Sequence, residues 1–284
     1  MPLEPGQFQI GSLVLGPKTP FKIESLDIGN YEINAQDFQT QSSDELRFGT
    51  DTFKPSPIQL TINVLANRSL PNIVALTRSA TQTFDDPTLS DLQREWRAED
   101  IRFQWGALKP LLFCGTDGIT RQFYGRPGKF TYKMPKQVQS DYYQAIAEFR
   151  RSDTLCYSDA EYYATLGNSP SNYLRTRGDA PSWVRFIITG PVTNPVIDFG
   201  AQQISLATNI PSGKVVEISS YPWARRIINS DGLSLAAYNN STDPYLDKIK
   251  FYPGVVTEMS WTGTGYNGST SVRIFWHDAY QVMM

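Results

Sequence analysis

The sequence is poor in the residues from which most catalytic and metal sites are built. It has one histidine, His277, and two cysteines, Cys114 and Cys156, which form no CxxC pair. A Ser-His-Asp triad would have to use His277, and no GxSxG segment supplies a nucleophile. The usual zinc ligand sets need more histidine or cysteine than this. The sequence therefore predicts no catalytic residues, no metal ligands and no cofactor, and both cysteines are expected to be free thiols in the core.

Charge and long apolar runs are also scarce. Charged residues make up 19% of the 284 residues and the net charge is −2, so there is no electrostatic case for a nucleic-acid or membrane partner. No apolar run approaches the roughly 18 residues that span a bilayer. The segment MPLEPGQFQIG lacks the basic and apolar regions of a signal peptide. We expect synthesis in a cytoplasm, no sequence-specific nucleic-acid binding and no membrane insertion.

Three short motifs have simpler structural explanations. The pairs Asp44-Glu45, Asp85-Asp86 and Glu99-Asp100 are adjacent in sequence, whereas glycoside hydrolysis needs two carboxyls that face each other across a cleft. GTGYNG, residues 263–268, satisfies GxGxxG, but the strand-like STSVRIFW follows it where a dinucleotide site needs a helix, so a hairpin turn is expected. The triplet RGD, residues 177–179, is expected to be a chance occurrence.

The composition instead favours β-structure, since 40% of residues are hydrophobic and 13% are aromatic. Residues 58–66 alternate Ile, Leu, Ile and Val with polar residues, as a half-buried strand does. One helix is expected after Asp86 and Pro87, with Leu89, Leu92 and Trp96 on one face, and a weaker one at 73–84. Residues 34–53 are expected to form a long polar loop and residues 125–128 a turn or kink. The Ala and Glu of residues 139–153 would suit a helix, but Tyr143, Ala145, Ala147 and Phe149 alternate along it and tyrosine favours strands, so a strand is expected there.

The second half is predicted to be all β. Short strand-like segments begin at Trp183 and recur at intervals of roughly 8 to 14 residues, which is typical of a sandwich or jelly roll. Its opening segment, ITGPVTNPVIDFG at 188–200, is expected to stop one strand and redirect the chain into the next. The domains predicted from the sequence are residues 1–157, a linker at 158–182 rich in Pro, Ser, Asn and Gly, and residues 183–284.

The order of several segments resembles the distal tail proteins of siphophages. In the second half these are FIITGPVTNPVIDFG, then VVEISSYPWARRIINSDGLSLAAYNN, LDKIKFYPGVVTEMSWTGTG and SVRIFWHDAY. In the first half, LQREWRAEDIRF, LLFCG, RQFYGRPGKFTYKMP and YYQAIAEFRRSDTLCYSD are similar to the ring-forming domain in tail proteins of actinobacterial phages. Two places depart from the family pattern: the segment SSYP at 219–222, and DTLCY at 153–157 where Asp-Pro-Tyr is usual.

The resemblance implies a mainly β protein with two domains. The first would be a ring-forming β-sandwich or split barrel with one or two helices, and the second a galectin-like β-sandwich. The family's role implies a homo-oligomeric ring, usually a hexamer, in the virion tail tip. It would join the tail tube to the tail-tip hub, let DNA and the tape measure protein pass, and carry or contact receptor-binding proteins or host glycans. No catalysis is implied.

Two other functions stay open from the sequence. One is a carbohydrate-binding module or receptor-binding component, in which exposed aromatics stack on sugar rings; the candidates in the second half are Tyr221, Trp223, Tyr252, Trp261 and Trp276. Each of these is more simply explained as a core residue. The other is a hydrolase whose site the sequence does not reveal.

Overall fold

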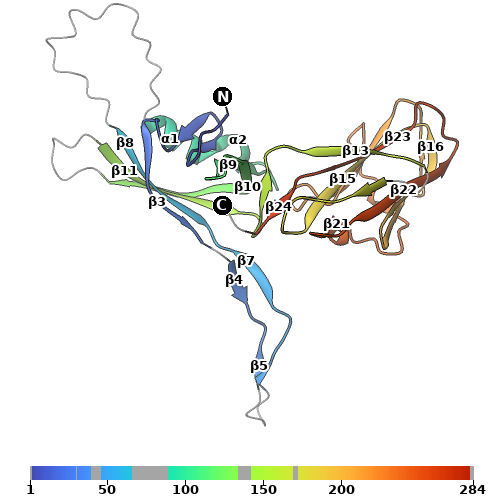
Figure 1. Cartoon of the computed structure of the whole chain (residues 1–284), viewed down its shortest axis with the longest axis horizontal. Coiled ribbons are helices and arrows are strands. Elements are labelled where there is room, and N and C mark those ends of the chain that lie inside the picture. Colours follow the sequence, from blue (N-terminus) through green and yellow to red (C-terminus); the bar gives the residue numbers. More distant parts are fainter. Residues whose placement is uncertain are drawn as a thin grey trace, which may run out of the picture. The chain divides into compact units, whose positions relative to one another are not determined.

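The structure, a computed structural model, describes residues 2–29, 31–39, 46–65, 89–133, 142–168 and 172–281. The chain divides into two compact units, Met1–Thr154 and Leu155–Met283, and both consist mainly of antiparallel strands (Figure 1). This confirms the predicted fold class. No helix within the described ranges is long and apolar enough to cross a membrane.

The first unit is organised around one curved antiparallel sheet with the strand order β2-β1-β9-β10-β11-β8-β3. Its strands are β1 (Phe8–Ile10), β2 (Leu13–Leu15), β3 (Phe21–Ile28), β8 (Ile58–Leu65), β9 (Lys109–Cys114), β10 (Thr120–Lys133) and β11 (Tyr142–Arg151). The alternation expected at 58–66 is confirmed, because Ile58, Leu60, Ile62 and Val64 are all buried in β8. The strand expected within residues 139–153 is β11, which pairs with β8 and β10.

The predicted amphipathic helix is also present. Helix α1 (Leu89–Arg97) buries Leu92 and Trp96, and the Trp96 indole donates a hydrogen bond to the Glu148 carbonyl of β11 (2.9 Å). A short second helix, α2 (Glu99–Arg102), follows Ala98. The expected cap Asp86 and the weaker helix at 73–84 lie outside the described residues.

The polar segment at 34–53 takes part in a ribbon of paired strands, where the sequence predicted a long loop. β4 (Tyr31–Asn34) pairs with β7 (Thr52–Pro55), and β5 (Phe38–Gln39) pairs with β6 (Leu46–Arg47). We call this ribbon the arm (Figure 1). The strands of the arm have too few apolar residues in alternation to indicate a buried face, so the sequence pattern did not predict them.

The segment around Gly125 to Gly128 forms a kink and no turn, because β10 continues through it with a bulge between Pro127 and Phe130. Glycine is needed at 125 for another reason. A Cβ built there would lie 2.1 Å from the carbonyl oxygen of Arg150, so the close approach of β10 and β11 excludes a side chain.

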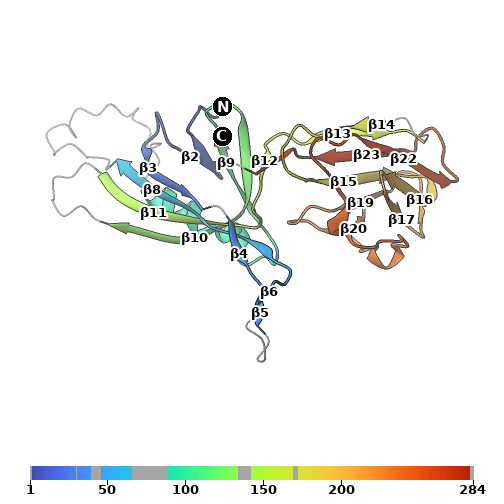
Figure 2. The ribbon, with the colours of Figure 1, turned by 60° about the horizontal axis from the view of Figure 1, so that its bottom comes forward.

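The second unit is a sandwich of two antiparallel sheets around a shared apolar core (Figure 2). The first sheet has the order β13-β23-β15-β19-β20, from β13 (Tyr162–Leu166), β15 (Ser182–Thr189), β19 (Val215–Ser219), β20 (Arg226–Asn229) and β23 (Ser271–Trp276), with β21 (Lys250–Phe251) on β15. The second has the order β14-β22-β16-β17, from β14 (Asn172–Leu174), β16 (Val192–Phe199), β17 (Gln202–Ser205) and β22 (Thr257–Thr264), with β18 (Asn209–Ile210) on β16. Two short 3-10 helices, Ala236–Tyr238 and Leu246–Lys248, lie in the loops.

The segment at 188–200 carries the chain from one sheet to the other. β15 ends at Thr189, and β16 begins at Val192 in the opposite sheet, after a cis Gly190-Pro191 peptide. The expected stop at Gly190-Pro191 is therefore confirmed. Asn194-Pro195 differs from expectation: it lies inside β16, where Asn194 has a φ of 49° and the pairing with β22 shifts register.

Residues 158–182, predicted to be a linker, hold strands β13 and β14 and the first residue of β15. The C-terminal strand β24 (Ala279–Tyr280) pairs with β12 (Cys156–Ser158), and both lie within the second unit. Cys114 and Cys156 are buried and neither takes part in a disulfide, as expected.

Candidate functional site

His277 occupies a buried structural position. Its ring Nδ1 donates to the carbonyl oxygen of Ser158 (2.8 Å), and the ring lies 5.9 Å from that of Tyr221. Burial is the main cause that lowers the pKa of His277 below its usual 6.5. In the part of the chain that the structure describes, no three His, Cys, Asp or Glu side chains are grouped so as to hold a metal ion.

The glycine motif at 263–268 connects two strands of different sheets. β22 ends at Thr264 and β23 begins at Ser271, and these strands do not pair with each other. The predicted hairpin is therefore wrong, although the turn itself is present, with Gly265 at a φ of 67°. Because a strand follows the motif, it lacks the helix N-terminus that a dinucleotide phosphate needs.

The RGD triplet is packed against the C-terminal segment. The Arg177 N–H donates to the Asp278 carboxylate (3.2 Å), and Asp179 accepts a bond from the Gln281 N–H (2.8 Å). A Cβ at Gly178 would lie 2.0 Å from the Ala279 carbonyl oxygen. The triplet therefore serves chain packing, and its glycine is required by that close approach.

The five candidate aromatics separate into core and surface. Tyr221, Trp261 and Trp276 are buried, and the Trp261 indole donates to the Leu166 carbonyl (3.0 Å). Trp223 is half-buried against Tyr221. Tyr252 is 49% exposed, more than the other four, and the Lys250 ammonium lies over its ring, 5.7 Å from the centre.

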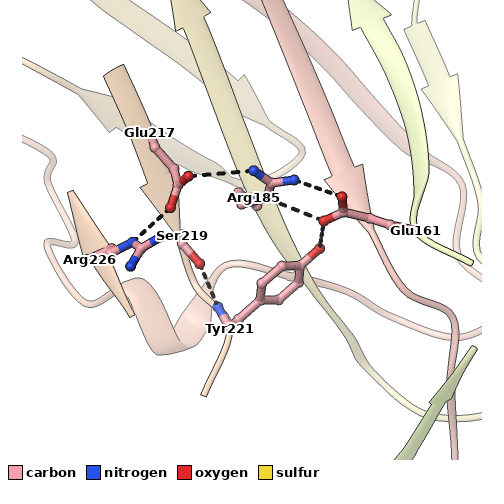
Figure 3. Close-up of polar contacts among 6 residues, drawn as sticks. All are labelled: Glu161, Arg185, Glu217, Ser219, Tyr221 and Arg226. Carbon is pink, nitrogen blue, oxygen red and sulfur yellow. Dashed lines mark hydrogen bonds and ion pairs between the residues drawn. The ribbon is translucent and has the colours of Figure 1, made fainter. Parts of the chain in front are cut away.

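A charged network on the first sheet of the second unit involves two carboxylates, and both are paired with arginine (Figure 3). Arg185 contacts Glu161 (2.7 Å) and Glu217 (3.5 Å), Arg226 also contacts Glu217 (2.8 Å), and the Tyr221 hydroxyl donates to Glu161 (3.0 Å). Partial burial opposes the charge on Arg185, but the bond to Glu161 and the nearby carboxylates outweigh it and raise the pKa of Arg185. The network ties β13, β15, β19 and β20 together and leaves neither carboxylate placed for acid-base chemistry.

The most exposed aromatic side chains of the first unit lie just after α2. Trp105 is fully exposed and Phe103 is 87% exposed. The surrounding backbone is fixed by cations: Arg102 donates to the carbonyls of Arg97 (2.7 Å) and Pro127 (3.2 Å), and Arg126 donates to those of Gln104 (2.6 Å) and Ala107 (2.5 Å). We call residues 103–105 the aromatic loop. Large aromatic side chains that are presented to solvent by a hydrogen-bonded loop are typical of a protein-binding surface.

The arm is the second exposed apolar feature of this unit. Tyr31, Ile33 and Phe53 are all more than half exposed, and the Tyr31 and Phe53 rings meet edge to face at 4.6 Å. A two-stranded ribbon has marginal stability by itself in water. The arm therefore has the properties of an element that gains stability by packing against another chain.

A groove lies at one end of the second sheet of the second unit. It has a volume of about 890 Å³ and is bounded by the turn after β16 and by the chain that leads into β22. Its polar lining includes Asp198, Glu258 and Ser260. The Tyr173 hydroxyl donates to Glu258 (3.2 Å), which raises the pKa of Tyr173.

No protein-family model matches the chain, and no curated protein matches it at a significant level. Solved structures do match it over nearly its whole length. The Dit protein of phage SPP1, described as a paradigm of the hub adsorption apparatus in phages that infect Gram-positive bacteria, aligns with a TM-score of 0.60 and 13% identity. This alignment covers 96% of this chain and 98% of SPP1 Dit. The chain has the fold of phage distal tail proteins.

Two baseplate structures extend the likeness. A chain of the phage P2 baseplate in its activated conformation with Ca aligns with a TM-score of 0.51 and 10% identity over 95% of this chain and 97% of that one. The form with Sr aligns with a TM-score of 0.50 and 11% identity over the same shares. SPP1 Dit and these two baseplate chains thus each align with both units of this chain.

Sequence reasoning missed the aromatic loop and the carboxylates of the groove. The segment IRFQWGALK places Phe103 and Trp105 between polar residues with a period of two, so the pattern suggests a half-buried strand. Asp198 and Glu258 lie in separate strands far apart in sequence, and only the pairing of β16 with β22 brings their ends to one face.

Proposed function

We propose that this chain is a structural subunit of the tip of a long, non-contractile phage tail. In this role the first unit assembles with copies of itself into a hexameric ring between the tail tube and the tail-tip hub. The protein is made in the host cytoplasm and is built into the virion. The observation that carries the proposal is the shared fold with SPP1 Dit, a hub protein, across 96% of this chain.

The exposed aromatics of the first unit support self-association. Trp, Tyr and Arg dominate the energetics of protein interfaces, whereas a monomer gains nothing by exposing them. Trp105 and Phe103 on the aromatic loop, together with Tyr31 and Phe53 on the arm, supply two such surfaces on one unit. Two distinct surfaces are what a ring needs, because each subunit contacts its neighbours through different faces.

The ring would have partners on both sides and a channel within. We propose contacts with the tail tube protein on one face and the tail-tip hub protein on the other, with receptor-binding proteins further outward. DNA and the tape measure protein would pass through the lumen. A net charge of −2 suits this role, since a strongly basic chain would retain DNA. The proposal includes no catalytic step.

The experiment is to measure the native mass of the purified protein and to image it by negative stain. A ring with about six times the chain mass of 32.0 kDa is expected. Trp105→Ser combined with Phe103→Ser should shift this species to smaller ones. Removing one interface hot spot costs about 2 kcal/mol or more, which is at least about a thirtyfold loss of affinity per contact.

The matched control is Tyr163→Ser, which removes a 66% exposed aromatic from the second unit. This variant should keep the mass of the wild type. A wild-type protein that stays monomeric at every concentration would count against a ring formed by this chain alone. Equal loss of the ring in both variants would count against the role of the aromatic loop.

A further inference from the structure

A second groove lies in the first unit, at the base of the arm, and we call it the basic groove. It has a volume of about 600 Å³ and lies where the chain leaves the arm and meets strands β10 and β11. Four cations, one carboxylate and three apolar side chains line it. These are Lys54, Arg126, Arg150 and Arg151, then Glu148, then Pro55, Pro57 and Leu108. Positive charge is thus concentrated here in a chain whose net charge is −2.

Two of the arginines face each other directly. Arg126 and Arg150 are opposite partners in the pairing of β10 with β11, which places their Cβ atoms roughly 5 Å apart on one face of the sheet. Like charges in that arrangement are destabilising. Arg126 donates to the backbone carbonyls of Gln104 and Ala107, which are neutral and leave its charge uncompensated. Within the described residues, neither arginine has an ion-pair partner.

The other charges of the basic groove do not cancel this pair. Lys54 forms an ion pair with Glu32 (3.1 Å), but the two side chains are 68% and 63% exposed, so the pair contributes little. Glu148 lies two residues before Arg150 on the same face of β11, and it forms no ion pair with a cation of the described chain. An incoming carboxylate would therefore relieve the repulsion between Arg126 and Arg150.

The lining favours a protein segment over a nucleic acid. Pro55, Pro57 and Leu108 offer an apolar surface that a phosphate backbone would not use. The Glu148 carboxylate would repel closely spaced phosphates. A peptide that carries carboxylates beside an aromatic side chain would use both the arginines and the apolar lining.

The far end of the arm has this composition. Residues 36–51 include four acidic residues and one basic residue, and Phe48 among them is 80% exposed. Asp37 and Asp51 are exposed and have no ion-pair partner among the described residues. The arm extends away from the sheet and carries β5 toward its far end, whereas the basic groove lies at its base (Figure 1). The acidic end and the groove of one chain are therefore held apart, and a second copy is needed to bring them together.

We infer that the basic groove receives the acidic far end of the arm of a second copy of this chain. Carboxylates of the arm pair with Arg126 and Arg150, and Phe48 packs on the apolar lining. Arm and groove are different surfaces, so the contact is heterologous and can be repeated around a closed ring. Arg126 also fixes the aromatic loop, so the groove adjoins the surface already proposed to bind a neighbour. The inference rests on the proposed self-association of the chain.

The test is a cycle of charge reversals in the full-length protein, read by sedimentation over a range of concentrations. The groove variant is Arg150→Glu, because this side chain is exposed and has no partner within the described residues. The arm variant combines Asp37→Lys with Asp51→Lys. Each variant places like charges in contact and should raise the concentration of half-assembly by about tenfold or more. All three changes in one chain restore opposite charges, so this chain should assemble better than either variant.

The matched control is Lys133→Glu, which makes the same change of charge at an exposed residue of β10 outside the groove. It should assemble as the wild type does. Salt gives a second measurement. An increase from about 0.1 M to about 1 M shortens the Debye length from about 10 Å to about 3 Å, and it should weaken assembly of the wild type more than that of Arg150→Glu. Circular dichroism checks that each variant is folded, and Arg150→Gln replaces Arg150→Glu if the latter is not.

The outcomes separate this contact from the proposed function. A ring that persists unchanged in the groove and arm variants, or losses that simply add in the combined chain, overturn the contact and leave the proposed function standing. The same holds if Lys133→Glu is as damaging as Arg150→Glu. Duplex DNA bound by the wild type and lost in Arg150→Glu, with assembly unchanged, would assign the groove to phosphates instead. A wild type that is monomeric at every concentration contradicts both proposals.

Discussion

Replacing Ser220 by alanine should destabilise the second unit far more than the same change at the neighbouring Ser219. Both serines belong to the segment SSYP, where the sequence departs from the pattern of the tail proteins it resembles. Both are buried, so exposure does not separate them. What separates them is the number of backbone groups that each hydroxyl satisfies.

The Ser220 hydroxyl joins three segments. Its oxygen accepts the Val184 N–H (2.9 Å) from β15, and its single proton is within reach of two carbonyl oxygens at 2.8 Å, those of Val184 and of Ile249, which precedes β21. Because the Val184 carbonyl also accepts the Ser220 N–H (2.9 Å), donation to Ile249 satisfies one more backbone group. The Ser219 hydroxyl accepts a single long bond from the Tyr221 N–H (3.4 Å).

Alanine at 220 would leave two buried backbone groups without this partner. Each buried unsatisfied group costs about 1–3 kcal/mol, so the two together predict a loss of about 2–6 kcal/mol. For a unit of this size, 1 kcal/mol lowers Tm by about 3 °C, which gives a decrease of roughly 6–18 °C. Ser219→Ala should cost less than about 1 kcal/mol, because a 3.4 Å contact contributes little.

Chemical denaturation followed by tryptophan emission measures the difference, since Trp183, Trp223, Trp261 and Trp276 all lie in the second unit. The two units are fitted as separate transitions. Equal losses in the two variants, or a loss below about 1 kcal/mol for Ser220→Ala, would refute the assignment of the hydroxyl as a three-segment link.

Three further changes test other parts of the fold. Burial lowers the pKa of His277 below 6.5, so on acidification the unfolded state binds a proton at a higher pH than the folded state does. The free energy of unfolding should therefore fall as the pH drops below about 6.5, by at most about 1.4 kcal/mol per pH unit. His277 is the only histidine, so His277→Gln should abolish that slope in a pH series of urea titrations. Gly178→Ala should lower the Tm of the second unit, whereas Gly268→Ala, with no atom within 4 Å of the added Cβ, should not. Trp96→Phe keeps the buried ring but loses the bond to Glu148, and calorimetry should show a loss of about 1 kcal/mol in the first unit.

The elements that the sequence predicted are those whose burial follows a local period. β8 alternates buried and less buried residues, and α1 places Leu92 and Trp96 four residues apart on one buried face. In both cases the pattern of side chains reports one face of one element. No knowledge of the rest of the chain is needed to read it.

Connections between sheets are not readable in this way. The glycines at 263–268 specify a turn, but a turn within a hairpin and a turn between two sheets require similar residues. Here β22 pairs with β16 and β23 pairs with β15, so the turn connects two sheets. These partner strands are distant in sequence from the turn, and a local pattern does not reveal them. The arm was missed for a related reason, because its exposed strands have no buried face to set a period.

The exposure of an aromatic residue also depends on the tertiary structure. It distinguishes aromatic residues that stabilise a core from those that are available for binding. Trp261 and Trp105 both have polar neighbours in the sequence. The Trp261 indole N–H donates a hydrogen bond inside a core, whereas Trp105 faces solvent. Trp105 is fully exposed and so contributes no buried area to the core of the first unit. Arg102 and Arg126 donate hydrogen bonds to backbone carbonyls near it. A loop ordered before binding loses little conformational entropy when a partner arrives, so more of the contact energy appears as affinity. The hydrogen-bonded backbone and the exposed rings therefore support the proposed role of the aromatic loop in binding another protein.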